Sequence, residues 1–108
     1  MLHMPEPNIG AGLRIAHGNS TVCIAKSIGE NFSIYQQVTV GFSKGGNPTI
    51  GNNVTIYAGA KVLGGVMIGN NVVIGANAVV KKDIPDNAIV VGCPGRIIGY
   101  RNPDEFLI

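Results

Sequence analysis

The sequence predicts an all-β fold in which short strands wind into three-sided coils stacked along one axis. From residue 50 onward an aliphatic residue recurs at every sixth position, a period that fits neither a helix nor an alternating strand. The segment "IGNNV" at 50–54 returns 18 residues later at 68–72, so three six-residue units complete one coil. Only 13% of residues are charged and 6% are aromatic, which suits a regular aliphatic stack better than a mixed core.

Six-residue repeats cover about residues 9–85, and each opens with an aliphatic residue; from residue 50 onward the fifth residue is also small or apolar. The opening residues are Ile9, Ile15, Val22, Ile28, Ile34, Val40, Ile50, Ile56, Val62, Ile68, Ile74 and Val80. Asparagine tolerates the left-handed backbone that a sharp corner requires. We therefore expect corners at the asparagines in fourth positions, which are Asn31, Asn53, Asn71 and Asn77.

Two interruptions break this period. The interval from Ile9 to Ile28 is 19 residues, one more than a coil, and that from Ile28 to Ile50 is 22, four more. We place the first extra residue in "GNST", directly after His17, and the second insertion in a protruding loop at 42–49. Protruding loops of repeat proteins commonly lie on the binding face.

Stacking the coils places the third residues of one set of repeats along a single edge. From the first coil onward these residues are His17, Gln36, Ala58 and Ala76. Neighbouring strands lie about 4.8 Å apart, so the column is continuous. A histidine at the head of a column of small residues predicts a groove with a reactive group at one end, which suits an extended acyl-carrier arm.

The remaining features predict one small domain over residues 1–108. A net charge of +2 without a run of Lys or Arg does not indicate a nucleic-acid partner. The start "MLHMPEPN" is no signal peptide and no apolar run is long enough to span a membrane, so we expect a cytoplasmic protein. Cys23 and Cys93 match no metal-ligand spacing and are expected to act as small apolar residues without a disulfide. We expect residues 86–108 to form a short tail or helix.

Four segments carry a resemblance to a known family. They are "IGAGLRIAHG", "IGENFSIYQQVTVG", "PTIGNNVTIYAGAKVLGGVMIGNNVVIGANAVVKKDIP" and "VVGCPGRIIG". Together they resemble the catalytic half of serine acetyltransferases and related sugar or polysaccharide O-acetyltransferases, over roughly residues 5–99. The resemblance implies a left-handed parallel β-helix of hexapeptide repeats and a homotrimer with active sites at subunit interfaces. It also implies acetyl-CoA as the co-substrate, with no metal required.

The resemblance also implies roles for individual residues. His17 matches the general base that takes the proton of the acceptor hydroxyl, a task that suits an imidazole with an unperturbed pKa of about 6.5. Gly41 is the candidate backbone N–H donor to the oxyanion. His3, in the terminal segment, receives no role.

Cofactor residues follow from the same resemblance. Ala58 and Ala76 match positions that line the pantetheine arm, where a bulky side chain would close the groove. Lys81, Lys82 and Arg96 match basic residues near the CoA phosphates, and cations there suit a pyrophosphate and a 3′-phosphate.

The acceptor site departs from the serine acetyltransferase pattern. Ala16 stands where those enzymes typically place an aspartate, and Gly46-Asn47 stands where they carry an Arg-His pair. The candidate acceptor-binding residues are Gln36, Lys44 and Asn47. Because an amino-acid acceptor should require an arginine for its carboxylate, these departures favour a sugar or polysaccharide hydroxyl, with serine as the alternative.

Two other functions are alternatives for a chain with this fold. The zinc carbonic anhydrase that shares this fold needs three histidines per zinc, one of them from a neighbouring subunit, whereas this chain has two histidines in all. A non-catalytic β-helix scaffold is the other alternative, and the departures around Ala16 and Gly46-Asn47 keep it open.

Overall fold

The chain forms three parallel sheets that stack short strands along one axis. The computed structural model describes residues 8–9, 14–15, 22–41, 43 and 45–101, and no helix occurs among them. The strands are β1 (Asn8–Ile9), β2 (Arg14–Ile15), β3 (Val22–Cys23), β4 (Ser27–Ile28), β5 (Ser33–Ile34), β6 (Thr39–Gly41), β7 (Thr49–Ile50), β8 (Thr55–Ile56), β9 (Lys61–Leu63), β10 (Met67–Ile68), β11 (Val73–Ile74), β12 (Val79–Val80), β13 (Ala88–Val91) and β14 (Arg96–Tyr100).

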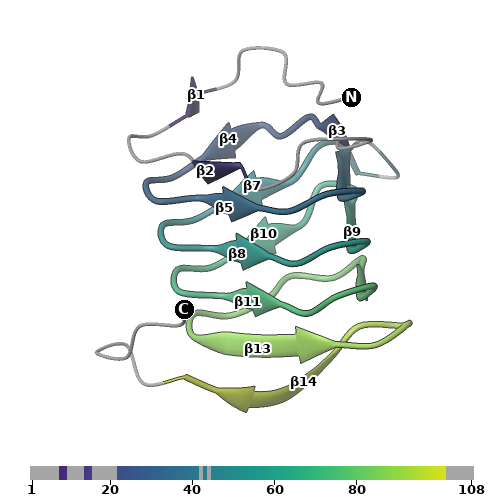
Figure 1. Cartoon of the computed structure of the whole chain (residues 1–108). Helices are drawn as coiled ribbons and strands as arrows, with labels where there is room; N and C mark the ends of the chain where they lie inside the picture. Colours follow the sequence, from purple (N-terminus) through teal and green to yellow (C-terminus); the bar gives the residue numbers. More distant parts are fainter. Residues whose placement is uncertain (1–7, 10–13, 16–21, 42, 44, 102–108) are drawn as a thin grey trace.

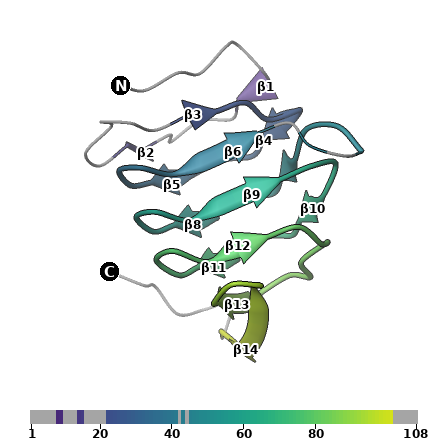
Figure 2. The ribbon, with the colours of Figure 1, turned by 90° about the vertical axis from the view of Figure 1, so that its right-hand side faces the viewer.

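From β1 to β12 successive strands enter different sheets, so three strands complete each coil. The sheets have the orders β1-β4-β7-β10, β3-β6-β9-β12 and β2-β5-β8-β11-β13-β14. The coils rise one above another in Figure 1, and Figure 2 shows the face formed by β6, β9 and β12. Ile9 pairs with Ile28 and Ile28 with Ile50, so both irregular intervals still close a coil in register. The expected left-handed parallel β-helix is confirmed.

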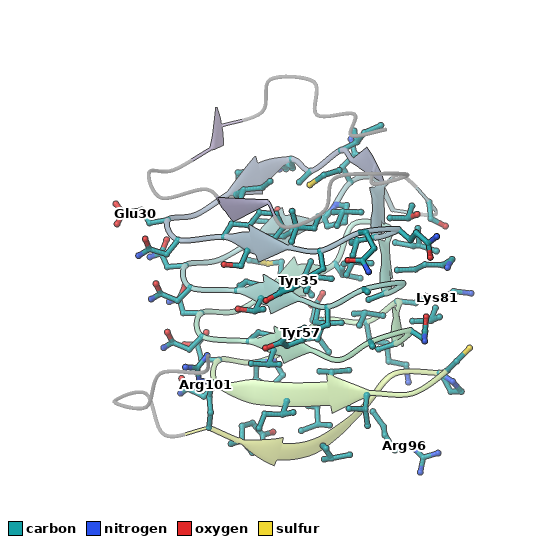
Figure 3. The ribbon with its side chains drawn as sticks, in the orientation of Figure 1. Glu30, Tyr35, Tyr57, Lys81, Arg96 and Arg101 are labelled. Carbon is teal, nitrogen blue, oxygen red and sulfur yellow. The ribbon has the colours of Figure 1, made fainter. Side chains whose placement is uncertain are left out.

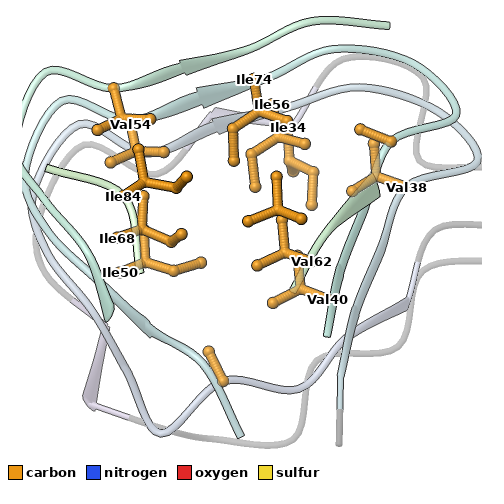
Figure 4. Close-up of a cluster of buried hydrophobic side chains, with 14 of the residues drawn as sticks. Ile34, Val38, Val40, Ile50, Val54, Ile56, Val62, Ile68, Ile74 and Ile84 are labelled. Atoms are coloured by element: carbon orange, nitrogen blue, oxygen red, sulfur yellow. The ribbon is translucent and has the colours of Figure 1, made fainter. Parts of the chain in front are cut away.

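The core contains an aliphatic column from each sheet, together with buried residues between the strands such as Val38 and Val54 (Figure 4). In one column Ile34, Ile56 and Ile74 pair in register and are fully buried. Each such side chain contributes roughly 1.5–3 kcal/mol on burial, so the repeat itself supplies the stability of the fold.

Asparagines lie at corners of the coil, as expected. Asn31, Asn53, Asn71 and Asn77 have φ values of 57°, 58°, 60° and 60°. At the corner shared by the first three, Asn31 Nδ2 donates to Asn53 Oδ1 at 3.0 Å, and Asn53 Nδ2 donates to Asn71 Oδ1 at 3.1 Å. The side chains that permit the corner therefore also tie consecutive coils together.

One predicted repeat opening is wrong. Cys23, rather than Val22, pairs with Val40 and is completely buried, while Val22 pairs with Thr39. Cys23 follows Ile15 by eight residues and precedes Ile28 by five, so the slip is a two-residue excess followed by a one-residue deficit. A thiol is small and apolar enough to take a valine's place in the column.

The C-terminal segment differs from the expected tail or helix. Residues 88–100 form an antiparallel hairpin of β13 and β14, and Val90 of β13 continues the column of Ile74. The β-branched run in "AIVV" favours a strand, and its alternate residues Ala88 and Val90 are buried. Figure 1 shows this hairpin at the end of the stack. Residues 102–108 lie outside the described part of the chain.

The two cysteines should differ in reactivity. Both are free, but Cys23 is buried, which raises the pKa of its thiol to about 12, whereas Cys93 is exposed. Because the thiolate is the nucleophile, we expect one thiol per native chain to react with a disulfide reagent at about pH 8, and two after unfolding. Cys93→Ser should abolish native labelling, and rapid labelling of that variant would contradict the burial of Cys23.

Candidate active site

The structure describes eight of the ten residues that the sequence analysis assigned to a site. His17 and Lys44 lie outside the described residues. The described residues are Gln36, Gly41, Asn47, Ala58, Ala76, Lys81, Lys82 and Arg96. No helix long and apolar enough to cross a membrane occurs in the described segments.

The expected column of small residues is present along the edge that follows β5, β8 and β11. Gly59 N donates to Gln36 O at 3.1 Å, and Asn77 N donates to Ala58 O at 2.9 Å, which stacks the three coils at this edge. Gln36 and Ala58 are half-buried and Ala76 is exposed. The methyl groups of the alanines therefore leave the backbone of this edge accessible to a ligand.

The three predicted phosphate-binding residues gather at the other end of the stack. Lys81 and Lys82 follow β12, Arg96 opens β14, and all three are exposed. Lys81 and Arg96 project from the same side of the molecule (Figure 3). A pocket of about 440 Å³ lies between the two lysines and the turn at 93–95, with Val79, Val80 and Ile84 as apolar lining. Cations beside an apolar pocket suit a phosphorylated ligand that also has an apolar or aromatic part.

The alanines and the lysines do not share an edge within one subunit. Ala58 lies between β8 and β9, whereas Lys81 lies beyond β12, on the far side of the β6-β9-β12 face (Figure 2). An extended ligand that touches both sets must cross that face or bridge two subunits.

Gly41 is not explained by packing or by backbone conformation. It is buried at the end of β6 beside Leu63, and its carbonyl accepts from Gly64 N at 3.0 Å. Its φ lies outside the left-handed region, and among the described residues an added Cβ would meet only Thr39 Cγ2, at 4.0 Å. The described residues would therefore admit an alanine there, so neither their packing nor the backbone conformation requires this glycine.

Ser43 and Gly46, in the insertion after Gly41, close a tight turn. Ser43 N donates to Gly46 O at 3.2 Å and Gly46 N donates to Ser43 O at 3.0 Å. Gly45 and Gly46 have φ values of 93° and 114°, which favour glycine. A Cβ added to Gly65 would collide with the Gly45 carbonyl, so the turn packs closely on the next coil.

A second pocket, of about 700 Å³, lies between this turn and the outer face of β4, β7 and β10. Its polar side chains are those of Lys26, Ser27, Asn47 and Thr49, and Met67 adds an apolar surface. Asn47 Oδ1 is buried and has no hydrogen-bond partner among the described residues. An unpaired buried acceptor costs about 1–3 kcal/mol, so this atom favours a ligand with a hydrogen-bond donor.

Known proteins share both the sequence and the fold. Residues 47–82 match the bacterial transferase hexapeptide (six repeats) family. The serine acetyltransferase of Mycobacterium tuberculosis is 46% identical over 104 residues, which are 92% of this chain and 45% of the relative. The structure of Neisseria gonorrhoeae serine acetyltransferase in complex with serine has a TM-score of 0.78 and 36% identity, and the match covers 86% of this chain and 40% of that one. A serine acetyltransferase complex with CoA has a TM-score of 0.78 and 35% identity, over 85% and 39% of the two chains.

By sequence and by fold, the chain resembles the hexapeptide-repeat acyltransferases, and the family model matches residues 47–82. It spans less than half the length of the relatives that it matches.

Sequence reasoning missed three residues that line the second pocket. Ser27 and Thr49 pair in register on the outer face, and Lys26 directly precedes Ser27. Outward positions of a repeat are normally solvated, so nothing marked them as functional. The strand register could have indicated this pocket, because it places Ser27, Thr49 and Met67 one above another beside the inserted turn.

Proposed function

We propose that this chain transfers the acetyl group of acetyl-CoA to the hydroxyl of L-serine. The observation that carries the proposal is the match over 92% of the chain to a serine acetyltransferase. Solved relatives are complexes with CoA and with serine. These relatives favour serine over the sugar or polysaccharide acceptor that Ala16 and Asn47 led the sequence analysis to prefer.

In the proposed mechanism His17 removes the proton of the acceptor hydroxyl as the oxygen attacks the thioester carbonyl. The carbonyl oxygen becomes an oxyanion that accepts a hydrogen bond from the backbone N–H of Gly41. Collapse of the tetrahedral intermediate breaks the carbon–sulfur bond, and the imidazolium of His17 returns the proton to the departing thiolate. The acetyl group thus passes directly to the acceptor.

CoA binding is assigned to the two sets of residues already described. Ala58 and Ala76 would leave room for the pantetheine arm, while Lys81, Lys82 and Arg96 would pair with the phosphates. Because the two sets lie on different edges of one subunit, we propose a homotrimer whose active sites lie between subunits, where the edge of one chain meets that of the next. We also propose a cytoplasmic location, which a supply of acetyl-CoA and the free thiols support.

An acceptor panel tests the proposed function. The protein is incubated with acetyl-CoA and either L-serine, simple sugars or a polysaccharide, and thiol release and acetylated products are followed. We expect release that depends on L-serine and exceeds that with any saccharide. Faster acetylation of a saccharide, with serine at the level of the water control, would replace serine by a sugar hydroxyl. Absence of acetyl-CoA binding in calorimetry would favour the non-catalytic scaffold.

A further inference from the structure

The pocket beneath the inserted turn has an uncompensated cationic side. Lys26 is exposed and lines this pocket together with the hydroxyls of Ser27 and Thr49. No Asp or Glu is among the described residues that line it. A lysine ammonium beside hydroxyl donors, without a carboxylate partner, favours an anionic group on the ligand.

The same pocket also offers the opposite polarity, from the inserted turn. Asn47 Oδ1 is buried and unpaired among the described residues, so it can accept a hydrogen bond from a ligand N–H or O–H. The turn that carries Asn47 is held against Gly65 of the next coil, which fixes the position of this acceptor relative to the outer face of β4 and β7. One pocket thus offers a cation for an anion and an acceptor for a donor.

We propose that this pocket binds the acceptor as a zwitterionic amino acid, with the α-carboxylate on Lys26 and the ammonium or hydroxyl group on Asn47 Oδ1. The inference rests on the proposed function and deepens it, because it names the residue that selects an amino acid. The arginine expected for the acceptor carboxylate is absent from the inserted loop, and Lys26 of the preceding coil takes its place in the pocket. Ser27 and Thr49 supply additional donors to the carboxylate.

Kinetics with a matched pair of acceptors test the contact with the carboxylate. Lys26→Met should raise the KM for L-serine by about 10- to 100-fold, the loss expected for a charge-assisted hydrogen bond, with kcat and the KM for acetyl-CoA unchanged. L-serinamide, which lacks the carboxylate, should show the same KM with wild type and Lys26→Met. Lys26→Arg should recover part of the affinity for L-serine.

Two further variants separate this role from a structural one. Lys61→Met removes the same charge from the outer face of β9, away from the pocket, and should leave the KM for L-serine unchanged. Asn47→Ala should raise the KM for L-serine and L-serinamide alike, because both keep the ammonium and hydroxyl groups. An unchanged KM for L-serine in Lys26→Met, or equal losses for both acceptors, would overturn the assignment of Lys26.

Direct binding makes failure of the inference distinguishable from failure of the proposed function. L-serine is titrated into wild type and Lys26→Met and followed by NMR, without acetyl-CoA. Binding that weakens in Lys26→Met supports the pocket even where the chain does not acetylate serine, which would refute only the proposed function. Acetylation of serine with normal kinetics in Lys26→Met would refute only the inference. No binding of L-serine to wild type at millimolar concentrations would overturn the pocket.

Discussion

Replacing His17 with alanine should lower the kcat/KM for acetylation of L-serine by a factor of about 10²–10⁴, the usual contribution of a general base. A serine hydroxyl is a weak nucleophile, and without His17 its proton would have to pass to water as the oxygen attacks the thioester. The rate is measured as thiol release from acetyl-CoA at saturating and at limiting serine. Because the residue acts on the reacting hydroxyl, kcat should carry most of the loss.

The chain offers a matched control for this variant. His3→Ala removes the only other histidine, to which no role is assigned, and should retain the wild-type rate. CoA affinity and thermal unfolding of His17→Ala should equal those of wild type, which separates loss of chemistry from loss of structure. A His17→Ala variant within about twofold of the wild-type rate would show that another group is the base.

The hexapeptide period predicted most of the fold because each level of structure follows from the one below. An aliphatic residue at every sixth position requires one inward side chain per strand, and three strands per coil follow from the 18-residue identity. Register is then fixed, since a slip by one residue would turn every inward side chain to solvent. The pairing of Ile34, Ile56 and Ile74 shows this register directly.

The two incorrect fold predictions, the repeat opening at Val22 and the C-terminal tail or helix, both fall where the six-residue period is broken or absent. Val22 and Cys23 are both small and apolar, so composition alone could not decide which residue enters the core column. In the structure it is Cys23, which lies five residues before Ile28. The segment after residue 85 has no six-residue period, and only its alternation of Ala88 and Val90 indicates a strand. Where the repeat ends, the local sequence pattern predicts the structure less well than the open sheet edge does. The last coil presents that edge at β11, and β13 pairs with it.

The site was predictable only as far as it follows the repeat. The edge of Gln36, Ala58 and Ala76 follows from spacing, and the structure contains it. The pocket of Lys26 and Asn47 depends on how an irregular turn folds back over Gly65, which no period describes. The functions of both regions remain predictions that the experiments above decide.

Replacing Ile56 with alanine should lower the free energy of unfolding by about 2–5 kcal/mol. Ile56 is fully buried at the middle of its column, between Ile34 and Ile74. The coils on either side cannot collapse into the cavity, because Tyr35 N donates to Ile56 O at 3.1 Å and Tyr57 N donates to Ile74 O at 2.9 Å. These ladder bonds hold the spacing of the coils, so the cavity remains and its cost is added to the lost burial. Urea unfolding at fixed protein concentration measures the effect, because subunit association also contributes to stability.

The matched control is Ile98→Ala, which removes the same atoms from a side chain that is 62% exposed on β14. In an isolated chain this change should cost no more than about 0.5 kcal/mol, because little apolar surface is returned to water. The difference between the two variants therefore isolates burial in the column from the intrinsic preference of isoleucine for a strand. A loss below about 1 kcal/mol for Ile56→Ala would mean that the coils do close around the cavity. The ladder would then be more compliant than its hydrogen bonds indicate, and the rigid edge that positions Ala58 and Ala76 would lose its physical basis.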